Sequence, residues 1–254
     1  MKKHALILGL LGVLGATGAS AATLLSENFD GIGAGTTPPT GWSLLSVAGT
    51  NTTWGAGGTA LTGVTTSTTT GLTTNDAPTS NNNNGYNALG ASGLTGDRCI
   101  ATAPTGNAGI VIESLSVANT LGGSITSFNI SYDIKRFTAG AAGADENPGY
   151  WLFYTLDAGT TWNNVSSLNP TLTNVPNTAG TTNISGTSIT LSSAWLAGSS
   201  MRLRWVDDNG LASSPDQILG LDNVVLTAAA VPEPASWSML AVGALALVAR
   251  RRRI

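Results

Sequence analysis

Carboxylates are the side chains through which this sequence could carry out acid–base chemistry. Between residues 22 and 230 the glutamates are Glu27, Glu113 and Glu146, which lie far apart in the sequence. Hydrolysis of a glycosidic bond needs two carboxyl groups held across a substrate groove. No Glu-x-Asp-x-x-Glu pattern, which would place carboxylates along one strand, occurs here. A glycan hydrolase therefore stays an alternative that needs a site assembled in space, and we expect no enzyme.

Histidine and cysteine chemistry is almost absent. The only histidine is His4, in the first residues of the chain, so the remainder holds no His-based triad, general base or metal ligand. The single Cys99 cannot form an internal disulfide, and one thiol without histidine is a poor zinc site. Two interpretations of Cys99 stay open: a reactive or intermolecular thiol, and the commoner small buried side chain.

The N-terminal segment has the pattern of a signal peptide. Lys2 and Lys3 precede an apolar stretch from Ala5 to about Gly15, and Ala19-Ser20-Ala21 is a small-x-small cleavage site. The apolar stretch is short for a membrane span and rich in small residues. We therefore expect a signal helix over residues 1–21, with signal peptidase cutting after Ala21.

The C-terminal segment, 231–254, combines three features in order. Val231 leads into Pro232, Glu233 and Pro234, an apolar run follows from Ala235 to Ala249, and four arginines come next: Arg250, Arg251, Arg252 and Arg253. Fifteen helical residues at about 1.5 Å each reach roughly 22 Å, which is short of the roughly 30 Å hydrocarbon layer. The arginines should stay on the cytoplasmic side, and the prolines keep their own segment extended.

This order of features closely resembles the PEP-CTERM sorting signal. The resemblance implies recognition by exosortase, a membrane protease that cuts at this motif in Gram-negative bacteria whose surfaces carry exopolysaccharide. It also implies a transient inner-membrane intermediate, followed by the cell surface, the outer membrane or the extracellular matrix. A permanent anchor with an ordinary stop-transfer cluster is the alternative that the residues leave open.

The part between these segments, residues 22–230, is expected to be one all-β domain. Outside the two terminal segments, five basic and thirteen acidic side chains leave a net charge of −8, which disfavours binding to nucleic acid. Strand alternation is clearest in Ile125–Phe137, and the other predicted strands are Tyr150–Leu156, Ser200–Val206 and Leu219–Thr227. Residues from about 50 to 90 are rich in Thr and Asn and are expected to form loops with one weak edge strand. Ser193–Leu196 is expected to form a helical turn.

Motifs spread over this domain resemble the choice-of-anchor J and cleaved-adhesin group, which is related to MAM and concanavalin-like domains. The resemblance implies a jelly-roll β-sandwich. The matching segments are Glu27-Asn28-Phe29-Asp30-Gly31, Pro38-Pro39-Thr40-Gly41-Trp42, Ile130-Ser131-Tyr132-Asp133-Ile134, Tyr154 to Trp162, and Gly220 to Leu226.

The segment from Thr155 to Trp162 also resembles the Asp-box of sialidases. That motif is a structural turn in which Asp157 caps the backbone, Gly159 adopts the conformation the turn needs, and Trp162 packs beneath. A sialidase would need several copies and an arginine cluster. One copy and four scattered arginines between residues 22 and 230 argue against that activity.

Calcium is the one cofactor that the sequence suggests, because oxygen ligands are plentiful. The sandwich resemblance implies a structural Ca²⁺ where the first and last strands meet, with Glu27, Asp30 and Asp222 as candidate ligands. The alternative is that Asp30 and Asp222 only cap turns. Among the tryptophans, Trp151, Trp162 and Trp205 are expected in the core, and Trp54 is the candidate for stacking on a sugar ring.

These features favour a non-enzymatic surface or extracellular-matrix protein with a structural or adhesive role, linked to exopolysaccharide or biofilm. A carbohydrate-binding, lectin-like module is the alternative, with exopolysaccharide or other glycans as partners. Selective, saturable glycan binding would distinguish the two.

Overall fold

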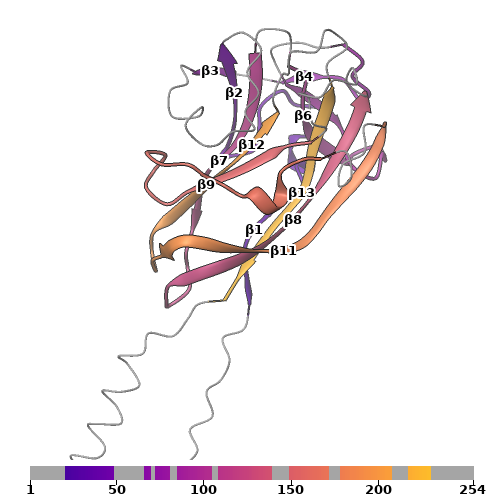
Figure 1. The fold of residues 1–254 in the computed structure, drawn as a ribbon. Helices are drawn as coiled ribbons and strands as arrows, with labels where there is room; N and C mark the ends of the chain where they lie inside the picture. The colour runs from indigo at the N-terminus through magenta and orange to yellow at the C-terminus, as the bar shows by residue number, and fades with distance from the viewer. Residues whose placement is uncertain are drawn as a thin grey trace, which may run out of the picture.

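The computed structural model describes residues 21–48, 66–69, 72–80, 85–104, 108–138, 149–171, 178–207 and 217–229. Over these ranges the chain forms two β-sheets that pack face to face, so the predicted all-β sandwich is confirmed (Figure 1). The two expected terminal helices and Trp54 lie outside the described residues. No helix within the described ranges is long and apolar enough to cross a membrane.

The first sheet has seven strands in the order β11-β8-β13-β6-β5-β4, and β1 pairs with β13 beside this path. All neighbours are antiparallel except β4 and β5, which run parallel. The strands are β1 (Ala22–Glu27), β4 (Thr73–Thr74), β5 (Tyr86–Leu89), β6 (Arg98–Thr102), β8 (Ile125–Thr138), β11 (Gly180–Trp195) and β13 (Ile218–Ala228).

The second sheet has six strands in the order β10-β9-β12-β7-β2-β3, all antiparallel. Its strands are β2 (Trp42–Ala48), β3 (Thr66–Thr69), β7 (Ala108–Ala118), β9 (Trp151–Thr155), β10 (Asn163–Asn164) and β12 (Ser200–Asp207). Two short 3₁₀ helices, η1 (Asp30–Ile32) and η3 (Ser166–Leu168), join strands.

Alternation of side chains explains how the sheets bury one face each. On β8, Phe128, Ile130, Tyr132 and Ile134 are buried, as the alternation over Ile125–Phe137 implies, while Asn129 on the opposite face is exposed. Successive side chains of a strand point to opposite faces, so one face of β8 joins the core and the other meets water. All five residues of β9 are buried, as expected for a strand covered on both faces.

Aromatic rings fill the space between the sheets. Trp42 on β2 contacts Phe29 with ring centroids 4.8 Å apart and Trp205 on β12 at 5.6 Å. Tyr132 from the opposite sheet meets Trp205 edge-on at 6.0 Å. The predicted core tryptophans, Trp151, Trp162 and Trp205, are all buried. One core thus joins strands from the start, the middle and the end of the domain.

Two sequence expectations need correction. Ser193–Leu196 does not form a helical turn, because β11 continues to Trp195, which pairs with Ile125 of β8. The expected loop region of about 50–90 extends too far, since its last residues form the buried strand β5. Within that region, the described strand β3 lies at the edge of the second sheet, where a weak edge strand was expected.

The domain begins and ends at the same end of the sandwich. Ala22, the residue after the predicted signal cleavage site, pairs with Ala228 at the end of β13. Figure 1 shows β1 starting and β13 stopping side by side at the lower end of the molecule. An attachment through the C-terminal segment would therefore act on this end of the domain.

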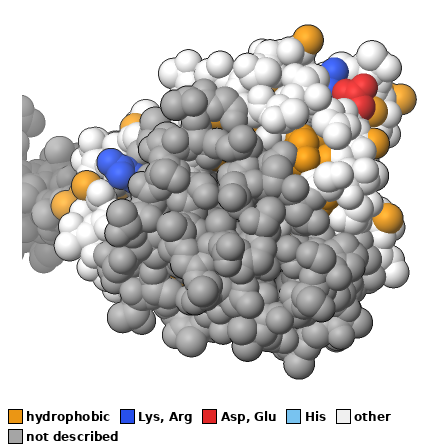
Figure 2. All heavy atoms as spheres, turned by 90° about the horizontal axis from the view of Figure 1, so that it is seen from above, with side chains coloured by type: hydrophobic (Ala, Val, Ile, Leu, Met, Phe, Trp, Pro, Cys, Tyr) orange, Lys and Arg blue, Asp and Glu red, His pale blue; other side chains and the backbone are white. Residues whose placement is uncertain are grey.

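The described part of the face seen in Figure 2 carries little charge. In the view of Figure 2, the described side chains are mostly uncharged, with single hydrophobic groups between them and only small spots of either charge. Scattered single hydrophobic groups are normal on a protein surface. The exposed large hydrophobic residues among those described are Leu94 and Leu196.

Candidate functional site

The turn between β9 and β10 is built around the carboxylate of Asp157. Its Oδ1 accepts hydrogen bonds from Thr155 Oγ1 at 2.7 Å and from the backbone N–H of Thr161 at 2.8 Å. These donors lower the pKa of Asp157 to about 2, with the Thr155 hydroxyl as the largest cause. Ala158 and Gly159 complete the turn with φ angles of 60° and 100°. The Asp157 side chain is therefore ionised at any physiological pH.

Trp162 lies beneath this turn, as the Asp-box resemblance implies. The ring is buried, and the guanidinium carbon of Arg204 on β12 lies 4.0 Å from its centroid. A cation over an indole face is a favourable contact. The turn is thereby fixed to the neighbouring strand of the second sheet.

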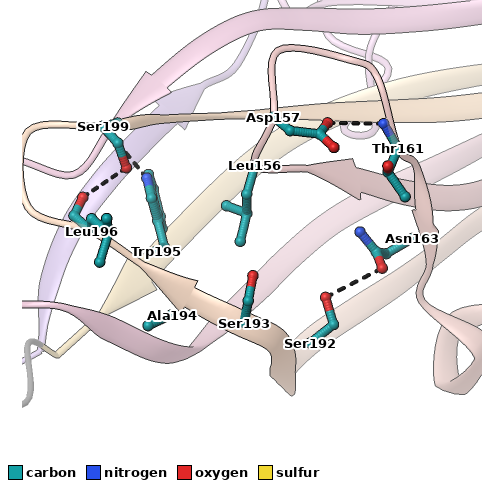
Figure 3. A pocket seen from close by; sticks show the side chains of 10 residues that line it. All are labelled: Leu156, Asp157, Thr161, Asn163, Ser192, Ser193, Ala194, Trp195, Leu196 and Ser199. Carbon is teal, nitrogen blue, oxygen red and sulfur yellow. Dashed lines mark hydrogen bonds between the residues drawn. The ribbon is translucent and has the colours of Figure 1, made fainter.

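A hollow of about 360 Å³ opens beside the turn (Figure 3). Its walls come from three places: the β9–β10 turn, the last residues of β11, and the β11–β12 connection. Leu156 lies in the middle, and Ser193 and Asn163 are directed into the space beside it, with Asp157 on the rim. A cleft of this size is at the low end of the roughly 300–1,000 Å³ typical of small-molecule sites.

Hydrogen bonds hold the walls of the hollow in place. Asn163 Oδ1 accepts from Ser192 Oγ at 3.2 Å, which links β10 to β11. On the other side, Trp195 Nε1 donates to the carbonyl of Ser199 at 3.0 Å, and Ser199 Oγ donates to the carbonyl of Leu196 at 2.8 Å. These bonds tie β10 to β11 and brace the β11–β12 connection.

A second hollow, of about 390 Å³, continues the first one. The two share Leu156, Asp157 and Ser199, and the second extends to Arg202 on β12. We call the combined surface the Asp157 groove. The wall that the two hollows share is formed by the ionised turn and Ser199.

The candidate calcium ligand Asp222 lies at a β-bulge. Pairing with β8 shifts between Asp222 and Val225, so β13 has one extra residue, and Asn223 takes a φ of 51°. On the other edge of β13, pairing with β6 ends at Leu221 and pairing with β1 begins at Val224. Asp222 therefore occupies the gap between two partner strands.

The Asp222 carboxylate fills this gap by accepting backbone hydrogen bonds. Oδ2 accepts from Ala91 N at 2.7 Å and Oδ1 from Asn223 N at 2.7 Å. The pKa of Asp222 is raised to about 6, first by burial, which outweighs these two donors, and further by the negative charges of Asp97 and Asp133. The side chain thus fastens the β5–β6 loop, residues 90–97, to β13.

Asp97 and Lys135 complete this fastening, which we call the Asp222 clamp. Asp97 Oδ2 accepts from Ser92 N at 2.7 Å, and Lys135 Nζ donates to the carbonyl of Gly90 at 2.6 Å. A Cβ on Gly90 would lie 2.5 Å from Asp222 Oδ2 and 2.6 Å from Asp97 Oδ1. Only glycine fits between the two carboxylates.

The other two calcium candidates are also engaged in local hydrogen bonds. Glu27 Oε1 accepts from Phe29 N at 2.8 Å, and Asp30 accepts from Arg98 N at 2.8 Å and from Asn28 Nδ2 at 2.7 Å. Within the described ranges, no three His, Cys, Asp or Glu side chains are grouped so that they could hold a metal ion. The carboxylates as placed do not fit a preformed Ca²⁺ site, so turn capping is the favoured alternative and calcium binding stays the competing hypothesis.

A buried polar cluster spans the sandwich at the far ends of β8 and β12. Thr102 donates to Asp207, Gln217 Nε2 donates to Asp207 Oδ1 at 3.2 Å, and Arg136 Nη1 donates to Gln217 Oε1 at 2.9 Å. Tyr150 closes the cluster with a hydrogen bond to the carbonyl of Leu219 at 2.8 Å. Buried polar groups need such partners, and the cluster supplies them to Thr102, Asp207, Gln217 and Tyr150.

The structure favours one of the two interpretations of Cys99. The side chain is fully buried, and Sγ donates to the carbonyl of Leu89 at 3.4 Å. Burial raises the pKa of the Cys99 thiol far above its ordinary value, and the negative charge of Asp222 adds to this effect. A buried thiol with a raised pKa is an inert packing group.

The sequence brought out some of these residues and missed others. The turn residues Asp157, Gly159 and Trp162 were found because they form a local motif. The groove residues Asn163, Ser193 and Leu196 were missed, since they meet only when β11 lies beside the β9–β10 turn. The sorting residues Pro232 to Pro234, the arginines 250–253 and Ala19 lie outside the described ranges, while Ala21 lies exposed just before β1.

Comparison with known proteins identifies the end of the chain. A family model described as the PEP-CTERM protein-sorting motif matches residues 230–253. The chain ends in a PEP-CTERM sorting motif. The matched segment starts two residues after the last residue of β13. A PEP-CTERM motif implies an exported protein, processed at the membrane by signal peptidase and exosortase, that reaches the surface of a Gram-negative bacterium.

Comparison with solved structures gives a weak match to one adhesin domain. The K3 cleaved adhesin domain of Lys-gingipain from Porphyromonas gingivalis w83 has 14% sequence identity to this chain and a TM-score of 0.34. The similarity covers 82% of this chain and 99% of that domain. No curated protein matches the sequence.

Proposed function

We propose that this PEP-CTERM protein is a non-catalytic component of the cell surface or extracellular matrix, with an adhesive or structural role in contact with exopolysaccharide. The sorting motif at residues 230–253 carries this proposal, because such a motif directs a chain to the bacterial surface. The hydrolase alternative has less support, since neither the groove nor the clamp holds two carboxyl groups facing each other across an open cleft.

The construction of the domain supports a role after export. Ala22 pairs with Ala228, so the predicted cleavage site precedes the first paired residue of the domain and the sorting motif follows the last one. Both processing steps can therefore act on segments outside the paired strands. The folded domain need not open for its own release.

The scarcity of charge supports a matrix environment. Charged residues make up 10% of the chain, whereas hydroxyl and amide side chains cover the exposed strand β11. Hydroxyl and amide groups exchange hydrogen bonds with water and with sugar hydroxyls alike. A surface of this kind stays hydrated without attracting nucleic acid or other polyanions.

The experiment that tests the proposal follows a tagged full-length chain in the bacterium that makes it. Changing Pro232, Glu233 and Pro234 together to alanine should leave the unprocessed chain in the inner membrane, whereas the unchanged chain should reach the surface or the matrix. A matched triple-alanine change at three exposed residues of β8, Thr126, Ser127 and Asn129, should not alter sorting. Equal processing and surface delivery of the motif variant would contradict the proposal.

A further inference from the structure

The Asp157 groove presents hydrogen-bonding groups that are not fully used by the described residues of the domain. Asp157 Oδ1 accepts the two hydrogen bonds that hold the turn, and the exposed carboxylate keeps further acceptor positions open to solvent. Likewise, Asn163 uses Oδ1 to accept from Ser192, and its Nδ2 has no partner in the described part of the chain. The hydroxyl of Ser193 is the third such group, and it points into the same hollow (Figure 3).

These three groups differ in what they can bind. A carboxylate oxygen only accepts hydrogen bonds, an amide nitrogen only donates them, and a serine hydroxyl does both. A ligand that satisfies all three must offer donors and acceptors close together. Vicinal hydroxyl groups do this, because each one donates one hydrogen bond and accepts others.

Apolar groups lie beside the polar ones in the groove. Leu156 forms the middle of the hollow, and Leu196 on its edge is 60% exposed. Ala194 adds a third apolar surface. Ligand sites combine apolar walls with a few placed polar groups, and a pyranose ring has both a C–H face and a rim of hydroxyls.

Charge limits the ligand further. Among the described residues that line the first hollow, Asp157 alone is ionisable, and its carboxylate is negative at physiological pH. This charge repels uronates and other anionic sugars. Arg202 lies at the far end of the second hollow and already has partners within the protein. A neutral sugar chain can follow the groove past both residues.

From this arrangement we infer that the Asp157 groove is a binding site for a neutral polysaccharide chain, with Asp157, Asn163 and Ser193 contacting hydroxyls and Leu156 and Leu196 contacting a sugar ring. The inference rests on the proposed function, because it names the part of the domain that would contact the surface polymer. The groove lies where β11 ends and β12 begins, towards the end of the sandwich at which β1 starts and β13 stops. A chain held by its C-terminus would present it to the glycans of the cell that makes it.

Isothermal titration calorimetry tests the inference. The full chain, in a detergent without a sugar headgroup, is titrated with neutral gluco-, galacto-, manno- and xylo-hexasaccharides, and with galacturonate and chitosan hexamers as charged probes. We expect saturable binding of at least one neutral probe and weaker binding of both charged ones. Failure of every neutral probe, or a preference for a charged probe, would overturn the inference.

Two variants with matched controls connect binding to the groove. Asn163→Asp keeps the acceptor that holds Ser192, but it replaces the free N–H donor by a second carboxylate, so we expect affinity to fall about tenfold or more. Asn129→Asp makes the same change on the exposed face of β8 and should bind normally. Leu196→Ser should weaken binding several-fold, whereas Leu94→Ser, at the other exposed leucine, should not.

The melting temperature of each variant is measured first, so that loss of fold is not mistaken for loss of binding. Equal affinity of Asn163→Asp and the unchanged chain would place any sugar elsewhere and overturn the inference. Surface delivery of the chain does not involve the groove. A negative binding result therefore leaves the sorting proposal standing, and a failed sorting experiment leaves the binding result standing.

Discussion

Two aspartates in this sandwich hold one loop each, and their pKa values are shifted in opposite directions from that of an ordinary aspartate. Asp157 stabilises the β9–β10 turn with a pKa lowered to about 2, and Asp222 fastens the β5–β6 loop with a pKa raised to about 6. Each accepts two short hydrogen bonds, at 2.7 and 2.8 Å in the first case and at 2.7 Å twice in the second.

The difference comes from their surroundings. The Asp157 turn projects into water, where the charge costs little and the donors decide the pKa. Asp222 is fully buried at a bulge, with the carboxylates of Asp97 and Asp133 nearby, so ionisation is opposed by desolvation and by like charge. A solvated carboxylate is available to a ligand, whereas a buried one mainly holds the fold together.

The largest effect is expected from removing the buried member of the pair. Asp222→Ala leaves the N–H groups of Ala91 and Asn223 without their acceptor and detaches a loop anchored across the sheet, so we expect a loss of about 3 kcal/mol of unfolding free energy at pH 5. Urea denaturation measures it. Asp157→Ala is the matched change, and its cost should be clearly smaller, because the exposed Thr161 N–H can bond to water. Equal losses of unfolding free energy in the two variants would contradict the idea that burial makes Asp222 the more important of the two aspartates.

A glycine in each region sharpens the same contrast. In the clamp, Gly90→Ala drives a methyl group against two carboxylates, and we expect a loss of about 2 kcal/mol from overpacking. In the turn, Gly159→Ala meets no contact closer than 3.7 Å and pays only for its φ of 100°, which should cost about 1 kcal/mol. Thermal denaturation of both variants provides the measurement, and the reverse order would show that backbone strain outweighs crowding.

These two regions also show how far the sequence alone could lead. The alternation of Phe128, Ile130 and Tyr132 predicted β8 because burial on one face leaves a period of two. Strand β11 was missed, since it lies at a sheet edge and its first buried residue is Ile189. An exposed edge strand made of Thr and Ser has a composition typical of a loop, so the sequence does not indicate a strand there.

The Asp157 turn, the Asp222 clamp and the Asp157 groove also differ in how far the sequence predicts them. Residues 155–162 are contiguous, so a local motif predicted the Asp157 turn and its buried Trp162. The clamp joins Asp222 to Ala91, which lies 131 positions away, and no local pattern encodes that contact. The groove needs Ser193 beside Asn163, and this juxtaposition depends on pairing between whole strands.

The pH dependence of stability should separate the two aspartates. The folded-state pKa of Asp222 is about 6, above the roughly 3.9 of an unfolded aspartate, so the folded protein holds this proton more tightly than the unfolded chain. The contribution of Asp222 to the free energy of unfolding is therefore fully present below pH 4 and is lost as the pH rises through 6. Asp157 behaves in the opposite way: its contribution is present above pH 4 and is lost as the pH falls through 2.

Urea denaturation at pH 4.5 and pH 7 checks this prediction against Asp222→Asn, which does not titrate. The unchanged chain should lose stability relative to Asp222→Asn on going from pH 4.5 to pH 7. For Asp157→Asn the same comparison should be flat over this window, because Asp157 stays ionised throughout. A flat result for Asp222 would mean that its carboxylate is better solvated than its burial implies.

The smallest effect is expected from calcium, and here the two hypotheses from the sequence diverge. If Glu27, Asp30 and Asp222 bound Ca²⁺ instead of capping turns, with a Kd of about 0.1 mM, then about 1 mM Ca²⁺ would raise the free energy of unfolding by roughly 1.4 kcal/mol. In the structure each carboxylate already accepts backbone N–H bonds, and ligation would have to break some of them. We therefore expect the melting temperature to stay unchanged when Ca²⁺ is added back after chelation. A rise of several degrees that disappears in Asp222→Asn would restore the calcium hypothesis and make the clamp a metal site.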